Sequence, residues 1–193
     1  MPEAGEENAT ALLALWNDVD PALDAAYNDW HAHEHVPERL TVPGILWALR
    51  YAASAGAADA PMPRYLTLYG LRDAQVLSSA PYRRLLEHPT PASRAMRPAL
   101  RRLSRWVCSL DIDDGIERFP HLALRTTGRS APTPARPAGG ALLVATRIPE
   151  AAPLPWLAGD QASPIEGDRL EGFAYQQPAA RPLDPATTAY ARI

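Results

Sequence analysis

The sequence contains no lysine, so all nineteen of its basic residues are arginines. A Schiff base to a carbonyl substrate or to pyridoxal phosphate needs a lysine amine. That chemistry is therefore excluded for this chain. The 22 acidic residues give a net charge of −3, whereas binding to nucleic-acid phosphates needs a clustered basic face. We therefore expect no nucleic-acid partner.

Cysteine and long apolar runs are also scarce. Cys108 is the single cysteine, so an intrachain disulfide is excluded, and a lone cysteine is more often a small buried apolar residue than a nucleophile. No apolar run approaches the roughly 20 residues that cross a membrane as a helix. Residues 1–7 are acidic and do not resemble an export signal. We therefore expect a cytoplasmic protein with no membrane partner.

Strands and helices alternate over the first two-thirds of the chain. The apolar and β-branched runs predict four strands, and the helix-forming stretches between them are marked by proline and by acidic caps. The expected strands are residues 11–16, 45–51, 64–71 and 103–110, and the expected helical regions are 21–35 and 73–87. This order is βαββαβ, which is the ferredoxin-like unit.

The last third of the chain has a different character. Residues 129–140 hold three prolines and two glycines, which is typical of a linker. Strands are expected at 141–148, 169–177 and 187–193, with a helical turn at 154–158. We therefore predict an α+β fold: a ferredoxin-like domain (1–118), a linker (119–140) and a reduced ferredoxin-like half of βαββ type (141–193). The two units would form an α/β barrel internally or by dimerisation.

The segment Trp30–Leu40 is the main candidate for a functional site. It holds three of the five histidines, and the helix that starts at Asp20-Pro21 should end at Pro37. Histidines on the last turn of a helix are favoured as imidazolium by the helix dipole. An unperturbed imidazole titrates near about pH 6.5. These residues are therefore candidates for acid–base chemistry.

His35 is interpreted as a general acid/base. Tyr69, Tyr51 or Tyr65 could donate a hydrogen bond to a substrate oxygen, and Arg50 could hold an enolate or phenolate. We assign the catalytic roles to His35, Tyr69 and Arg50. The alternative is that His35 only caps the helix or bonds a loop carbonyl.

A metal site is the second interpretation of the same segment. His31 and His35 are four residues apart and share a helix face, and Glu34 and Glu38 could add carboxylate oxygens. However, the HExxH order is absent, His33 points away from that face, and no third ligand identifies itself. We therefore predict that no metal is bound.

Aromatic residues could wall a pocket for a planar apolar ligand. Five tryptophans stand against two phenylalanines, and most should lie in the core. We place Trp30 and Trp47 near the pocket, and add His31, Tyr51 and Tyr65 as substrate-binding residues. No glycine-rich loop leads from a strand into a helix, so nucleotide binding is disfavoured.

Two sequence motifs resemble the EthD-like branch of the dimeric α/β-barrel superfamily. The first is EHxPERLxxPGxxxxxRY at residues 34–51, and the second is HPTPxSRxM at 88–96. The resemblance covers mainly residues 11–110. It implies a ferredoxin-like unit whose sheet packs on a second one, and it places His35 where the relatives carry a recurrent histidine. His31 and His33 depart from the pattern, which has a tyrosine and an acidic residue there.

The resemblance also implies a function. Related barrels include polyketide cyclases, lactone isomerases and small monooxygenases that use no metal or bound prosthetic group. We therefore predict a cofactor-independent enzyme that transfers a proton during isomerisation, cyclisation or elimination of a small apolar or aromatic molecule, either a carbonyl compound or a phenol. The alternative is a non-catalytic ligand-binding or assembly protein. A homodimer is a possible partner state.

Overall fold

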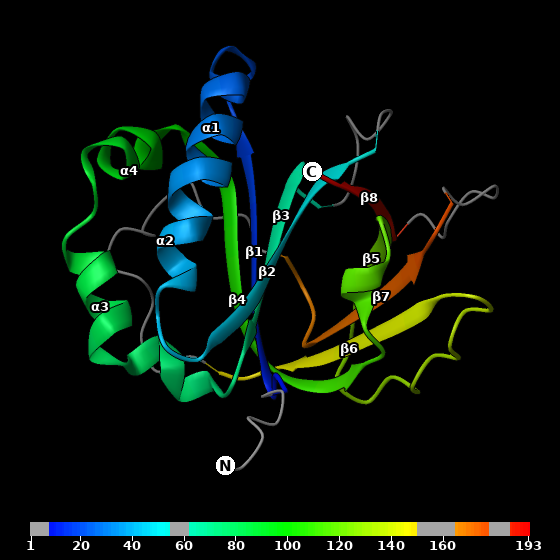
Figure 1. The fold of residues 1–193 in the computed structure, drawn as a ribbon. Coiled ribbons are helices and arrows are strands. Elements are labelled where there is room, and N and C mark those ends of the chain that lie inside the picture. Colours follow the sequence, from blue (N-terminus) through cyan, green and yellow to red (C-terminus); the bar gives the residue numbers. More distant parts are fainter. Residues whose placement is uncertain (1–7, 55–61, 150–164, 178–185) are drawn as a thin grey trace.

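Eight antiparallel strands form one closed barrel in the computed structural model (Figure 1). The structure describes residues 8–54, 62–149, 165–177 and 186–193. The strand order around the barrel is β1-β3-β2-β8-β5-β7-β6-β4, and each strand pairs with both neighbours. The strands are β1 Ala11–Val19, β2 Ile45–Ala53, β3 Tyr65–Leu71, β4 Leu100–Asp113, β5 His121–Thr127, β6 Ala141–Arg147, β7 Arg169–Tyr175 and β8 Thr188–Arg192.

The helices gather on one side of the barrel, over the outer face of β1–β4 (Figure 1). The chain reaches them twice, between β1 and β2 and between β3 and β4. The helices are α1 Asp24–Trp30, α2 Val36–Leu40, α3 Ala80–Glu87 and α4 Pro91–Met96, and a π-helical turn, His31–His35, joins α1 to α2. Short 3₁₀ turns lie at Pro21–Leu23, Ala74–Ser78, Arg97–Ala99 and Ile116–Arg118.

The first helical segment starts where the sequence predicts and continues further than expected. The Asp20 carboxylate accepts a hydrogen bond from the Ala22 amide at 2.9 Å, and Pro21 occupies the first helical position. Pro37 does not end the segment. The Val36 amide donates to the carbonyl of His31, five residues earlier, and this wider turn lets the helix pass a proline that has no N–H to donate.

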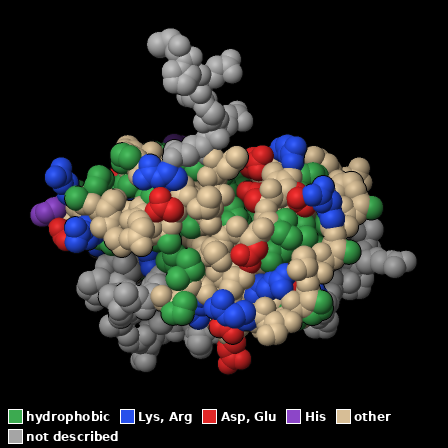
Figure 2. Space-filling model, turned by 90° about the horizontal axis from the view of Figure 1, so that it is seen from below, with side chains coloured by type: hydrophobic (Ala, Val, Ile, Leu, Met, Phe, Trp, Pro, Cys, Tyr) green, Lys and Arg blue, Asp and Glu red, His purple; other side chains and the backbone are tan. Residues whose placement is uncertain are grey.

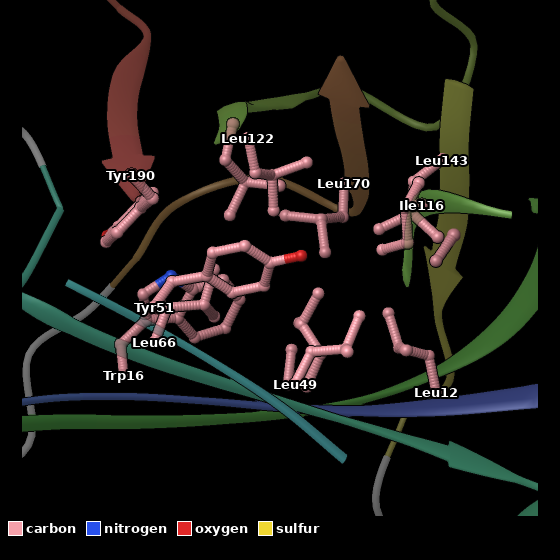
Figure 3. Packing of buried hydrophobic residues seen from close by; sticks show 14 of the residues in the cluster. Leu12, Trp16, Leu49, Tyr51, Leu66, Ile116, Leu122, Leu143, Leu170 and Tyr190 are labelled. Atoms are coloured by element: carbon pink, nitrogen blue, oxygen red, sulfur yellow. The ribbon is translucent and has the colours of Figure 1, made fainter. Parts of the chain in front are cut away.

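Successive side chains of each strand point to opposite faces of the sheet, and this separates two apolar layers. In β3, Leu66 and Leu68 point into the barrel, where they join a core that includes Leu12, Trp16, Trp106 and Tyr190; Figure 3 shows several of these side chains converging. Tyr65 and Tyr69 have the opposite parity and belong to the layers between the sheet and the helices. The barrel interior is thus a packed core, and any helix-side site is separate from it.

The predicted ferredoxin-like fold class was wrong. The structure is an eight-stranded closed antiparallel barrel with few helices, not a ferredoxin-like α/β unit that carries a reduced second half. The prediction of a dimeric α/β barrel is corrected by the same finding. The physical reason is that the later strands pair with the edges left by β1–β4: β6 pairs with β4 and β8 pairs with β2. Closing the ring within one chain gives each of the described strands a partner on both sides.

Most expected elements are present, with one strand missed. The seven strands predicted from the pattern correspond to β1–β4 and β6–β8. β5, with the sequence HLALRTT, was missed because it lies within residues 119–140, which were predicted to be a linker. The division into domains 1–118 and 141–193 stays a prediction. The helical turn at 154–158, including Trp156, lies outside the described residues.

The surface carries charges of both signs. On the face shown in Figure 2, arginine and acidic side chains are interspersed among apolar and neutral ones. None of the helices in the described part of the chain has the length and apolar composition needed to cross a bilayer.

Candidate functional site

A cavity of about 50 Å³ lies between the helices and the outer face of β1 and β4. The π turn and its neighbours form one wall, and α3 and the strands form the others. The lining residues are Leu15, Asn17, Tyr27, Trp30, His31, His35, Arg39, Tyr82, Leu86, Arg97, Leu100, Leu103 and Arg105. Three predicted site residues, Trp30, His31 and His35, are therefore brought together in one cavity.

Tyr27 anchors the first helix against the sheet. Its side chain is buried, and its hydroxyl donates a 3.0 Å hydrogen bond to Oδ1 of Asn17 on β1. Burial raises the pKa of Tyr27 well above its usual value, so the phenol stays protonated and keeps this donor role. The bond sets the position of the helix that carries both cavity histidines.

The aromatic rings of the site form a contiguous cluster of tilted pairs. The His31 and His35 ring centroids are 5.1 Å apart, Trp30 lies 4.6 Å from His35, and Tyr27 lies 5.2 Å from His31. The π turn brings these side chains onto one face, while His33 points outward and contacts Asp29 at 3.1 Å. The prediction that His33 faces away from the other two is confirmed.

The two cavity histidines are neutral. Burial, and then the charges of Arg39, Arg97 and Arg50, lower the pKa of His35 to about 3. Burial also lowers the pKa of His31 well below its usual value, with smaller effects from His35, Arg50 and Arg39. The expectation that a helix end would favour imidazolium was wrong, because His35 is buried, lies near three arginines, and is followed by α2 instead of ending the helix.

Several buried polar atoms in and beneath the site lack hydrogen bonds. His31 Nδ1, His35 Nδ1 and the Tyr69 hydroxyl have no hydrogen-bond partner within the described ranges. Such an atom costs about 1–3 kcal/mol, and native proteins retain few of them. Their concentration here is typical of a place where a ligand or solvent supplies the missing bonds.

Three arginines from different elements meet at the cavity. Arg39 of α2 is 5% exposed; its Nη1 lies 3.5 Å from Oε2 of Glu38, and its guanidinium lies 5.9 Å from the centre of the Tyr82 ring. Arg97 follows α4, and Arg105 is on β4. Burial, and then the positive charge of Arg39, lower the pKa of Arg97.

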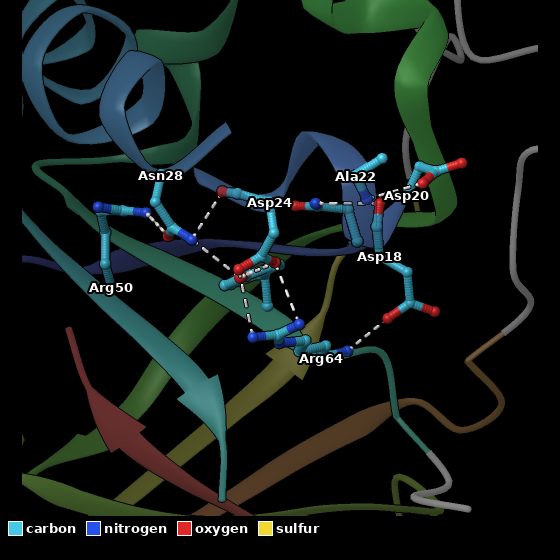
Figure 4. A network of polar contacts seen from close by, with 9 residues as sticks. Asp18, Asp20, Ala22, Asp24, Asn28, Arg50 and Arg64 are labelled. Carbon is cyan, nitrogen blue, oxygen red and sulfur yellow. Dashed lines mark hydrogen bonds and ion pairs between the residues drawn. The ribbon is translucent and has the colours of Figure 1, made fainter. Parts of the chain in front are cut away.

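Arg50, Asn28 and Asp24 belong to a polar network (Figure 4), and hydrogen bonds join Tyr65 to it. Arg50 Nη2 donates to Oδ1 of Asn28 at 3.0 Å, and Asn28 Nδ2 donates to the Tyr65 hydroxyl at 2.9 Å. The Tyr65 hydroxyl donates in turn to Asp24 at 2.5 Å, and Arg64 pairs with Asp24 at 3.1 Å. Arg50 and Tyr65 line an open groove beyond α1 and not the cavity.

The other predicted residues point elsewhere. Trp47 and Tyr51 pack with the core inside the barrel, and the Trp47 ring covers Gly70 so closely that a Cβ there would lie 2.1 Å from it. Tyr69 is completely buried between sheet and helices. Its hydroxyl does not line the cavity. Cys108 is buried inside the barrel, as expected for a small apolar residue.

Several lining residues were missed in the sequence. Tyr82, Arg97 and Arg105 come from segments far from the histidines, and the sequence alone does not bring them there. The available signal was weak: an arginine-rich stretch at 94–105 interrupted by apolar residues at strand spacing. No group of three or more histidine, cysteine or acidic side chains suited to a metal ion occurs in the ranges described.

The comparisons with known proteins support the fold alone. No family model and no curated protein matches the chain. A solved structure described as an anthrone oxidase-like protein matches with a TM-score of 0.53, at 10% identity, over 95% of this chain and 90% of that one. What the two share is the fold. The resemblance to the EthD-like branch stays a prediction.

Proposed function

We propose that this protein is a cofactor-independent acid–base enzyme that acts on a small apolar carbonyl or phenolic substrate in the helix-side cavity. The observation that carries the proposal is His35: a neutral imidazole with an unsatisfied buried nitrogen, on the wall of a cavity lined by apolar side chains and arginines. A neutral imidazole has the lone pair that a general base needs.

In the proposed reaction, His35 takes a proton from the carbon next to the substrate carbonyl. The electron pair of the broken C–H bond forms the enolate, and the guanidinium groups of Arg39, Arg97 and Arg105 stabilise the charge on its oxygen. The developing negative charge raises the basicity of the imidazole as the proton moves. His35 then returns the proton at another carbon or to a leaving group, so the enzyme is restored.

The predicted roles of Arg50 and Tyr69 change in this proposal. Neither side chain lines the cavity, so both are positioning residues. Arg50 acts through the imidazoles, whose pKa values it helps to lower. Tyr69 lies beneath the site, where the pKa of its hydroxyl is raised by burial and moderated by Arg39.

A non-catalytic ligand-binding protein is the second candidate. The observation that favours it is the pKa of about 3 for His35, because a base works best when its pKa lies near the working pH. A binding protein would use the same cavity without moving a proton. The likeness in fold to an anthrone oxidase-like protein is compatible with an aromatic ketone as ligand in either case.

Deuterium exchange separates the two candidates. Acetone and phenylacetone are neutral ketones of different size with acidic C–H groups, and their exchange in D₂O can be followed by proton NMR. Acetone is the one closer in size to the cavity of about 50 Å³. We expect the protein to accelerate exchange of at least one of them by about tenfold or more, and His35→Gln to remove this acceleration. His33→Gln is the matched control, because His33 is exposed on the same turn. Binding of a ketone without faster exchange would support the ligand-binding function and refute the catalytic one.

A further inference from the structure

A large open groove lies on the opposite side of the first helical segment from the cavity. Its walls are α1 and the π turn on one side, and β2, β3 and the residue after β8 on the other. The groove has a volume of about 480 Å³, whereas the cavity has about 50 Å³. Sites for small organic molecules usually have volumes of roughly 300–1,000 Å³, so such a molecule fits in the groove.

Arg50 places a positive charge without counter-charge in this groove. Its side chain is half-buried, and its Nη2 donates to Oδ1 of Asn28 at 3.0 Å. The ionisable groups that act on it are the phenols of Tyr27, Tyr69 and Tyr65, and no described carboxylate forms an ion pair with it. Burial lowers the pKa of Arg50, which reflects the cost of keeping a cation away from water. A bound anion would offset this cost.

The other charged groups of the groove have partners. Arg64 Nη1 lies 3.1 Å from Oδ1 of Asp24. Asp29 is the acidic residue of the lining; it is exposed, and its Oδ1 lies 3.1 Å from Nδ1 of His33. Among the described residues of the groove, Arg50 is therefore the cation that has no acidic side chain beside it.

The Arg50 guanidinium is held in place by its neighbours (Figure 4). Asn28, which accepts its hydrogen bond, donates from Nδ2 to the main-chain carbonyl of Asp24 at 3.0 Å and to the Tyr65 hydroxyl at 2.9 Å. These bonds fix the Asn28 amide, so the guanidinium is oriented before a ligand arrives. A preoriented cation loses less conformational entropy on binding than a mobile one.

The apolar part of the groove lies next to this cation. Ala32 of the π turn and Ala52 of β2 line it together with Ile193. Ile193 is 52% exposed, although it is a large apolar side chain, and its amide donates to the carbonyl of Arg50 at 3.0 Å. The groove thus offers an apolar wall beside a single cation.

We infer that this groove is a binding site for an organic acid, whose carboxylate pairs with Arg50 while its apolar body lies against Ala32, Ala52 and Ile193. A guanidinium matches a carboxylate through parallel N–H donors. A single arginine also balances the one charge of a carboxylate, whereas a phosphate group carries nearly two. The site is separate from the helix-side cavity, and the inference does not depend on the proposed function.

2-Naphthoate and 2-naphthamide test the charge requirement, because they have nearly the same shape and differ in charge. Both are too large for the cavity of about 50 Å³. Isothermal titration of the intact protein should show naphthoate binding at least about tenfold more tightly than naphthamide, with the difference shrinking at high salt. Arg50→Gln should weaken naphthoate by about tenfold and leave naphthamide nearly unchanged.

Arg83→Gln is the matched control, because Arg83 is an exposed arginine on α3. It should leave both affinities unchanged. Circular dichroism of each variant establishes that it is folded. Ile193→Ala is a second test if Arg50→Gln fails to fold, because this exposed side chain forms the apolar wall. It should weaken naphthoate and naphthamide alike, by about threefold or more.

The outcomes separate this inference from the proposed function. Equal affinity for naphthoate and naphthamide would overturn the inference. Naphthoate that binds equally well to the wild type and to Arg50→Gln, or to the wild type and to Ile193→Ala, would also overturn it, because its site would then lie elsewhere. Ketone exchange reports on the cavity, so preferential naphthoate binding without exchange would support this inference and refute the enzyme. Exchange without naphthoate binding would do the reverse.

Discussion

Burial decides the chemistry of the histidines at the scale of single residues. His33 and His35 are two positions apart, yet one is exposed beside Asp29 and the other is packed against Trp30 with a strongly lowered pKa. The sequence identified His35 as the candidate base. It could not give the direction of the pKa shift, because this depends first on burial in the folded molecule and then on arginines from three different parts of the chain.

The lowered pKa of His35 predicts how stability depends on pH. The folded pKa of about 3 lies below the unfolded value of about 6.5, so the unfolded chain binds more protons between these values and stability falls as pH falls below about 6.5. From about pH 7 to about pH 5, His35 alone should remove about 2 kcal/mol from the free energy of unfolding.

Urea unfolding of the wild type and of His35→Gln at both pH values measures this loss. The variant should lose about 2 kcal/mol less than the wild type. A proton NMR titration in which the His35 ring signal shifts with a midpoint near pH 6.5 would contradict the prediction.

The hydrogen bond between Tyr27 and Asn17 gives a second residue-scale prediction. Tyr27→Phe removes the donor and leaves the buried Asn17 oxygen without it, so the free energy of unfolding should fall by about 1–3 kcal/mol. Tyr175→Phe, at a half-buried position, is the control and should cost less. If urea unfolding gave the same loss of free energy of unfolding for both variants, the hydrogen bond to Asn17 would not contribute to stability.

The π turn is the feature that matters at the scale of elements. It lies between two short α-helices and holds both cavity histidines, and its extra residue sets how α2 is rotated relative to α1. The sequence predicted one helix that ends at Pro37, since a proline inside a helix normally stops it. What overrode this preference is packing on both sides, with Tyr27 and Trp30 buried before the turn and Val36 buried after it.

Deleting Ala32 should convert the π turn into an α-helical one. Either the residues before it or those after it must then leave their buried positions, so the free energy of unfolding should fall by about 2–5 kcal/mol, as for the loss of a large core side chain. Ala32→Gly keeps the residue count and should cost only about 1 kcal/mol. Thermal unfolding of the two variants provides the comparison, and a deletion no more costly than the glycine would mean that the turn is not set by packing.

Closure of the barrel is the property of the whole molecule. β8 completes the ring by pairing with β2 at Tyr51, Ala52 and Ala53 and with β5 on its other edge. The Tyr190 hydroxyl fixes it further through a 2.7 Å hydrogen bond to the carbonyl of Pro63. All eight strands come from one chain, so a second subunit is not needed to cover a sheet edge.

This closure predicts that folding does not depend on protein concentration. The midpoint of urea unfolding should stay constant over a roughly hundredfold range of concentration, because an obligate dimer would become more stable as its concentration rises. Tyr190→Ala should lower the midpoint at every concentration alike. A midpoint that rises with concentration would show that subunit association contributes to the fold, and would revive the predicted homodimer.

The sequence by itself determined the local features: the approximate positions of seven strands, the burial of Cys108, and the outward direction of His33. These follow from short-range periodicity and capping, which act between neighbours in the chain. Only the tertiary structure decided that the ring closes within one chain, that Trp47 and Tyr51 turn into the core, and that Arg97 and Arg105 meet His35. Those outcomes depend on which edges pair and which side chains become buried together, and no pattern along the chain encodes such long-range contacts by itself.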